Sequence, residues 1–158
     1  MKTARERKED RYHRIFLQLK ELLQKSPNPI ARMATIAAVL QHKMDGFFWT
    51  GFYLLEDGNL IVGPYQGPLA CQVLEKNRGV CWAAINNQKT IVVPDVNEFP
   101  GHIACDSRSR SEIVIPLRDN TDHITGVLDI DSNIPGRFDD TDAGNLEMIA
   151  NLIYLSGN

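Results

Sequence analysis

The sequence predicts an α+β fold in which helices cover one face of an antiparallel sheet. Apolar residues recur at helical spacing at the start of the chain, at every second position from Phe47 onward, and at helical spacing again near the end. Two hairpin signals lie in the middle part, so the strands there are expected to run antiparallel. Helices followed by antiparallel strands and a last helix are typical of an α+β sandwich.

The two helices at the start of the chain are marked by apolar stripes and by prolines. The first stripe consists of Tyr12, Ile15, Phe16, Leu19, Leu22 and Leu23. The segment Ser26-Pro27-Asn28-Pro29 ends this helix, because proline cannot continue the backbone hydrogen-bond ladder. Asn28 is expected to cap a second helix with Pro29 at its first position. The stripe of the second helix consists of Ile30, Met33, Ala37 and Leu40.

Five strands are expected between the early helices and the last one. In chain order they are Phe47–Glu56, Asn59–Tyr65, Thr90–Val93, Ser111–Arg118 and His123–Ser132. Asp57-Gly58 is a strong turn signal for the first hairpin, and the polar turn around 119–122 joins the last two strands. Between the hairpins, Gly79–Asn87 is expected to be a short helix, and 97–109 has no period and is expected to be a loop.

The last helix is expected to start near 139–141 and to end before Gly157. Its apolar face consists of Leu146, Ile149, Ala150 and Ile153.

Length and charge exclude several classes of protein. The chain has 158 residues, which suits a single domain. Its net charge of −3 gives no electrostatic reason to expect a nucleic-acid partner. The charged N-terminus is not a secretory signal, and no stretch approaches the ~20 apolar residues of a membrane span. We therefore expect a cytoplasmic protein with no membrane partner. The sequence does not fix the oligomeric state, and a homodimer is one state that it allows.

Alternation along the strands places carboxylates and aromatic rings on the same sheet face. Ile113, Ile115 and Leu117 are expected to pack on the helices, which turns Glu112 to the opposite face together with Asp129 and Asp131. In the first strand, Trp49, Gly51 and Tyr53 share one face, and Phe48, Thr50, Phe52 and Leu54 share the other.

Such a group of carboxylates suits an ammonium group. The carboxylates also raise one another's pKa, which can leave one of them protonated and able to donate a proton. The pattern alone, however, favours a solvated acidic face, with the Trp and the Tyr in the core.

The three cysteines indicate redox chemistry without assigning roles. Cys71, Cys81 and Cys105 cannot form a closed set of bridges, and none of them forms a C-x-x-C pair. Cys81 lies at the start of a short helix, and Cys105 lies in a loop with nearby basic residues, so both settings favour thiolate. Asp106 opposes that effect. A zinc site made of the three cysteines and His102 stays open as an alternative.

Five segments resemble the free methionine-(R)-sulfoxide reductases, which are single-domain enzymes of the GAF fold. They are Gly63-Pro-Tyr-Gln-Gly-Pro-Leu-Ala-Cys71, Arg78-Gly-Val-Cys81, Gly101-His-Ile-Ala-Cys-Asp106, Ser111-Glu-Ile-Val-Ile-Pro116 and Gly126-Val-Leu-Asp-Ile-Asp-Ser132. The resemblance runs from about residue 29 to 155 and includes all three cysteines of the family motif. It implies one GAF domain over residues 1–158, with an N-terminal helix and linker over 1–28.

The resemblance also implies a six-stranded antiparallel sheet, with the first and last helices on one side and a loop-covered pocket on the other. The implied reaction is reduction of free L-methionine (R)-S-oxide without a metal or organic cofactor. By position, Cys105 matches the attacking cysteine, Cys71 the principal resolving cysteine and Cys81 an additional one. Residues that match the family's substrate-binding positions are Trp49, Tyr53, Glu112, Asp129 and Asp131.

The implied chemistry passes through a sulfenic acid on Cys105 and then a disulfide, which thioredoxin or a similar dithiol reopens. The family usually has glycine at position 82, where this chain has Trp82. A bulky ring beside Cys81 restricts access to its thiol, so our hypothesis is that Cys71 is the main resolving residue. Two other functions stay open: a GAF module that senses a small ligand without chemistry, and a structural zinc protein.

Overall fold

A six-stranded antiparallel sheet forms the centre of the molecule. The computed structural model describes residues 1–102 and 105–156. The strands are β1 (Trp49–Glu56), β2 (Asn59–Gln66), β3 (Val73–Leu74), β4 (Ile91–Val93), β5 (Ser111–Arg118) and β6 (Ile124–Ser132). Their order in the sheet is β3-β2-β1-β6-β5-β4, with every neighbouring pair antiparallel. The predicted α+β class and the six-stranded antiparallel sheet are confirmed.

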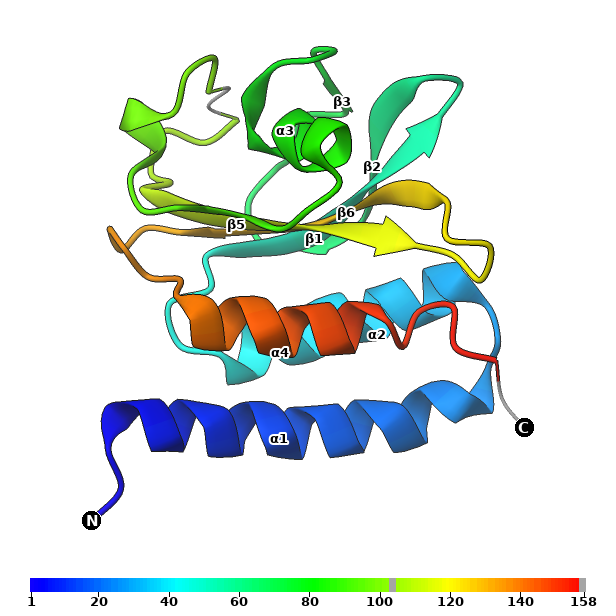
Figure 1. Ribbon diagram of the computed structural model, residues 1–158, viewed down its shortest axis with the longest axis vertical. Coiled ribbons are helices and arrows are strands. Elements are labelled where there is room, and N and C mark those ends of the chain that lie inside the picture. The colour runs from blue at the N-terminus through cyan, green and yellow to red at the C-terminus, as the bar shows by residue number, and fades with distance from the viewer. Residues whose placement is uncertain (103–104, 157–158) are drawn as a thin grey trace.

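Three of the four α-helices in the described residues lie on one side of the sheet (Figure 1). The helices are α1 (Ala4–Leu22), α2 (Pro29–Lys43), α3 (Gly79–Asn87) and α4 (Asp140–Ala150), with short 3-10 turns at Leu23–Lys25 and Val96–Glu98. Figure 1 shows α2 and α4 against the sheet and α1 in a further layer outside them. Their apolar faces and the Ile/Leu face of β5 and β6 form one continuous core.

A buried carboxylate fastens the outer helix to the rest of the molecule. Asp142 of α4 has a fully buried side chain, and the Tyr12 hydroxyl of α1 donates a 2.6 Å hydrogen bond to it. The Lys8 ammonium, also from α1, lies 2.9 Å from the same carboxylate, and the Arg137 guanidinium lies 3.3 Å away. Because a buried charge needs such partners, this cluster fixes α1 on α4.

Most of the capping and turn residues recognised in the sequence have the predicted role in the structure. Asn28 caps α2 by accepting a hydrogen bond from the backbone N–H of Ala31, and Pro29 starts that helix. Asp57 and Gly58 both have positive φ, as a tight two-residue turn between β1 and β2 requires. Asp139 caps α4. The helix ends at Ala150, and Gly157, expected after its end, lies outside the described residues.

Several details of the prediction are wrong. Leu22, expected in the apolar stripe of the first helix, is 48% exposed. The two-residue strand β3 was not predicted from the alternation. Ile30 is half exposed instead of lying in the α2 stripe, where Ile36 is buried instead. Phe48 does not share the helix-side face of β1: it lies one residue before the strand begins, so alternation does not fix its direction, and it packs toward the opposite side.

The other side of the sheet carries α3 and the long loops. Figure 1 shows α3, β3 and the loop around residue 100 gathered above this face, away from the other helices. A second apolar cluster fills the space between α3 and the sheet, and includes Val80, Trp82 and Ala84 of α3. Within the described residues, no helix combines the length and the apolar character that crossing a membrane requires.

Candidate active site

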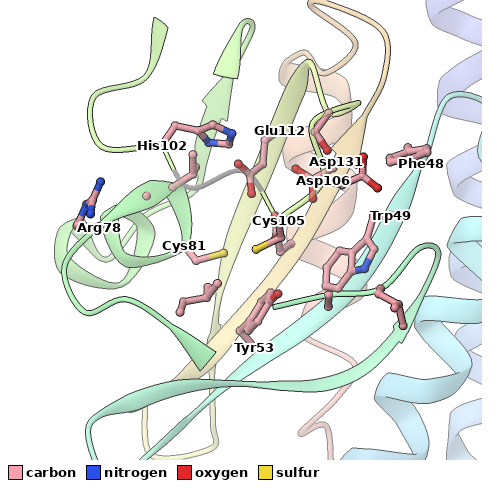
Figure 2. Close-up of a pocket in the computed structure, with 17 residues that line it drawn as sticks. Phe48, Trp49, Tyr53, Arg78, Cys81, His102, Cys105, Asp106, Glu112 and Asp131 are labelled. Atoms are coloured by element: carbon pink, nitrogen blue, oxygen red, sulfur yellow. The ribbon is translucent and has the colours of Figure 1, made fainter. Parts of the chain in front are cut away.

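A pocket lies between the sheet and the α3 side of the molecule. Its lining includes seven of the eight residues that the sequence singles out, and these are Trp49, Tyr53, Cys81, Cys105, Glu112, Asp129 and Asp131. The eighth, Cys71, is joined to Cys105 by a disulfide. Figure 2 shows the side chains of Cys81, Cys105 and Glu112 pointing into this pocket from α3, the long loop and β5. The fold thus brings all eight residues to one place.

Stacked aromatic rings form one wall of the pocket. The Trp49 ring stacks on Tyr53 with 5.7 Å between centroids, and on Tyr65 at 5.3 Å. Gly51 makes room for this arrangement, because a Cβ there would collide with Tyr65 and with the Trp49 ring. The Tyr53 hydroxyl donates a 3.2 Å hydrogen bond to the backbone carbonyl of Cys71, which ties the wall to the disulfide loop.

Strand register brings the three carboxylates together. Glu112 of β5 lies opposite Asp131 of β6, and Asp129 is two residues away on the same face. Glu112 and Asp129 are 6% and 5% exposed, and Asp131 is half-buried. The expectation of a solvated acidic face is therefore wrong. The covering residues come from α3 and from loops that are distant in the sequence.

Burial changes the acidity of these carboxyl groups. Desolvation raises the pKa of Glu112, and the charges of Asp129 and Asp131 raise it further. Desolvation also raises the pKa of Asp131, with Asp129 adding to the effect. For Asp129, burial raises the pKa while hydrogen bonds from Glu112 and Cys81 lower it. The group therefore holds at least one proton more readily than separate carboxyls in water.

Buried polar atoms in the pocket lack partners. Among the described residues, Asp129 Oδ1 and Trp49 Nε1 are buried without a hydrogen bond. No salt bridge in the described part of the chain includes Glu112, Asp129 or Asp131. Buried polar atoms normally have partners. Asp129 Oδ1 is therefore free to accept a hydrogen bond from a positively charged ligand group, and the Trp49 Nε1–H is free to donate one to a ligand acceptor.

The disulfide joins two loops across the rim of the pocket. The Cα atoms of Cys71 and Cys105 are 5.6 Å apart, and the two residues are separated by 34 positions. Cys105 is exposed and Cys71 is partly exposed, so a reductant in solution can reach the bond. The bond uses two of the three cysteines, so this structure has no site for zinc made of three cysteines and His102.

Cys81 is the remaining thiol, and it is buried. Its place at the start of α3 indicated a thiolate, but desolvation raises its pKa well above the ordinary value, and the nearby Asp129 and Glu112 raise it further. Burial among carboxyls thus outweighs the helix terminus. Trp82, which follows it, is 4% exposed and belongs to the core beneath α3.

Phe48, His102 and Asp106 also line the pocket, although the sequence did not predict a place for them in a substrate site. The Arg108 guanidinium lies 4.8 Å from the ring centroid of Phe48. Arg108 also pairs with Asp106 and holds the pKa of that carboxyl at about 2. Burial lowers the pKa of His102. The clustering of these charged residues around Cys105 was the signal. Positions 103 and 104 of this motif lie outside the described residues.

Comparison with known proteins agrees with this geometry. The GAF domain model matches residues 28–156. The free methionine-R-sulfoxide reductase of Escherichia coli is 45% identical over 120 residues, which cover 76% of this chain and 72% of that protein. The yeast (Saccharomyces cerevisiae) free methionine-R-sulfoxide reductase is 37% identical over 94% of this chain and 87% of its own. The chain belongs to the free methionine-R-sulfoxide reductases of the GAF family.

A solved structure extends the similarity to three dimensions. The free methionine-R-sulfoxide reductase of Neisseria meningitidis, in complex with its substrate, superposes with a TM-score of 0.86 at 41% identity. The match covers 90% of this chain and 86% of that structure. The present chain thus combines the expected six-stranded sheet, a pocket on the sheet face away from α1, α2 and α4, and two cysteines joined by a disulfide.

Proposed function

We propose that this enzyme reduces free L-methionine (R)-S-oxide to L-methionine, with Cys105, Cys71 and the pocket carboxyls as its working groups. The observation that carries the proposal is the pocket itself. It places a disulfide-forming cysteine beside a cluster of buried, proton-holding carboxyls and an aromatic wall. The similarity to reductases of this name supports the choice of substrate.

Each side of the pocket suits one end of the substrate. The rings of Trp49 and Tyr53 offer an apolar surface for the methyl end of the sulfoxide. The carboxylate cluster has no cationic partner of its own among the described residues, and Asp129 Oδ1 lacks a hydrogen bond. An amino-acid ammonium group supplies both a positive charge and hydrogen-bond donors. A methionine sulfoxide inside a peptide has no free ammonium group, which favours the free amino acid as the substrate.

The proposed chemistry balances in three steps. The Cys105 thiolate attacks the sulfoxide sulfur while a protonated carboxyl among Glu112, Asp129 and Asp131 protonates the oxygen. Methionine leaves, and the oxygen stays on Cys105 as a sulfenic acid. The Cys71 thiol condenses with the sulfenic acid, releasing water and forming the disulfide. An external dithiol then reduces this bond with two electrons and becomes a disulfide itself.

Thioredoxin or a similar dithiol is the proposed reductant, and the cytoplasm is the proposed compartment, because the bond must be reopened at every turnover. We also propose that residues 1–158 act as one domain, in which 1–28 form the outer helix and linker. The contact of Tyr12 with Asp142 supports that reading. A homodimer stays a prediction.

The decisive experiment is a coupled assay with thioredoxin, thioredoxin reductase and NADPH. The wild-type protein is expected to oxidise NADPH with the free R-sulfoxide and not with the S-sulfoxide. Cys105→Ser is expected to lose turnover and to keep binding the R-sulfoxide in calorimetry. Activity on the S form alone, or undiminished turnover by Cys105→Ser, would contradict the proposal. Ligand binding by the wild type without NADPH oxidation would favour a sensor module instead.

A further inference from the structure

A second set of reactive groups lies within the pocket and is separate from the disulfide. Cys81 Sγ and one carboxylate oxygen each of Glu112 and Asp129 lie within 4.8 Å of one another, and all three residues are buried. The proposed reaction needs the two carboxyls, but it is complete without Cys81 once Cys71 resolves the sulfenic acid. The cluster therefore raises the question of what a buried thiol does between two carboxyl groups.

We propose that Cys81, Glu112 and Asp129 form a binding site for a thiophilic divalent cation such as Zn²⁺ or Cd²⁺ in the substrate-free enzyme. Sulfur and carboxylate oxygen are both ligands of zinc, and three protein ligands with one open position are a common arrangement for this ion. The thiol proton, and the proton held by the carboxyl pair, are released to the buffer when the cation binds. The open position faces the pocket, because all three residues line it.

Rigid elements hold the three ligands in place. Cys81 is in the first turn of α3, Glu112 is near the start of β5, and Asp129 is in the middle of β6. The β5 and β6 residues are fixed by their register in the sheet, and α3 packs on the same strands. The three ligand atoms already lie within 4.8 Å of one another, so only small side-chain movements are needed for all three to reach one ion.

An unpartnered atom provides independent support for a ligand at this point. Asp129 Oδ1 is buried and accepts no hydrogen bond within the described structure. Neither Glu112 nor Asp129 is in any of the salt bridges found there, so no side chain neutralises this part of the pocket. Buried polar atoms normally have a partner, and a divalent cation supplies one to Asp129 Oδ1.

The site overlaps the place that the proposed function gives to the substrate ammonium group. If that function holds, a bound cation excludes the substrate and inhibits the enzyme competitively. This consequence rests on the proposed function, whereas the metal site itself does not. The two are therefore tested by separate measurements on one sample.

The test uses the oxidised protein, in which the Cys71–Cys105 disulfide leaves Cys81 as the single thiol. Cd²⁺ is titrated while the ultraviolet charge-transfer band between thiolate and cadmium is recorded, and calorimetry gives the stoichiometry. We expect one ion per chain, no band with Cys81→Ser, and affinity reduced about tenfold or more by Glu112→Gln or Asp129→Asn. Glu98→Gln, at an exposed acid outside the pocket, is the matched control and is expected to bind as the wild type does.

Two results would overturn the metal site. One is the absence of the thiolate–cadmium band in oxidised wild-type protein that is shown to have one titratable thiol. The other is a band that neither Glu112→Gln nor Asp129→Asn weakens. Melting curves confirm that each variant is folded, and Glu112→Gln keeps the thiol, so the test does not depend on Cys81→Ser alone. Excess free methionine sulfoxide, which the oxidised enzyme cannot reduce, is expected to displace the ion. If cadmium binds but the sulfoxide does not compete, the metal site stands and the substrate placement fails.

Discussion

Glu112 and Asp129 illustrate how burial sets the properties of single residues here. Both are nearly inaccessible to water, and neither forms a salt bridge within the described residues. Their protonated forms are favoured, because burial raises the pKa of both groups. A carboxyl group in this place keeps its proton to a higher pH than an exposed carboxyl does, as a proton donor to the sulfoxide oxygen requires.

This arrangement predicts a pH-dependent cost to stability. Between the ordinary carboxyl pKa of about 4 and the raised value, the folded state binds more protons than the unfolded state, so stability falls as pH rises. We expect Glu112→Gln or Asp129→Asn to stabilise the protein at about pH 8 by on the order of 1 kcal/mol, and much less at about pH 5. Urea unfolding at both pH values measures this. An equal effect at both would contradict it.

Cys71 and Cys81 are expected to contribute unequally to turnover. Cys71 already reaches Cys105, whereas Cys81 is buried with a raised pKa and is therefore a poor nucleophile. We expect Cys71→Ser to slow thioredoxin-supported turnover at least about tenfold, and Cys81→Ser to change it less than about threefold. The single-turnover yield of methionine should be preserved in both. Intact turnover by Cys71→Ser together with loss in Cys81→Ser would show that the hypothesis is wrong.

At the scale of elements, the packing of the aromatic rings on β1 depends on Gly51. A Cβ at Gly51 would collide with Tyr65 and with the Trp49 ring. Gly51→Ala is expected to displace the aromatic wall, to raise KM more than it lowers kcat, and to destabilise the protein by about 1–3 kcal/mol. Gly144→Ala is the matched control, because nothing lies near that position in α4 and alanine favours a helix. Kinetics and urea unfolding of both variants test this, and equal effects on both would contradict it.

Long periodic elements could be predicted from the sequence, and short ones could not. The strands β1, β5 and β6 have eight or nine residues each, enough for alternation to show which side chains share a face. The strand β3 has two residues, which have no period, and it exists because its backbone pairs with β2. Phe48 was misplaced for a related reason, because alternation holds only inside a strand.

At the scale of the whole molecule, the larger apolar core and the pocket lie on opposite sides of the sheet. We therefore expect Tyr12→Phe, which removes the 2.6 Å hydrogen bond to buried Asp142, to lower the free energy of unfolding by about 1–3 kcal/mol. Activity below the melting transition should be unchanged. Tyr154→Phe, at a half-buried hydroxyl that bonds to Thr125, is the control and is expected to cost less. If fully folded Tyr12→Phe protein loses activity, the helix side of the sheet is not independent of the pocket and the prediction is wrong.

The covering of the pocket is also a property of the whole molecule, and the sequence could not predict it. Alternation placed Glu112, Asp129 and Asp131 on one face, but their burial depends on α3 and on loops that fold over them from elsewhere in the chain. Whether a strand face is exposed to water or covered by protein depends on the tertiary structure. For the same reason the pattern favoured a solvated face, and only the family motifs indicated a site there.

The disulfide has one further consequence, which concerns the unfolded chain. It links residues 34 positions apart, and a loop of that length lowers the conformational entropy of the unfolded state by the equivalent of ~4 kcal/mol at 25 °C. If the bond opens and closes at each turnover, the resistance of the protein to heat and to proteolysis oscillates with it. The form that awaits substrate is then the fragile one, and a cell short of reductant accumulates the durable one.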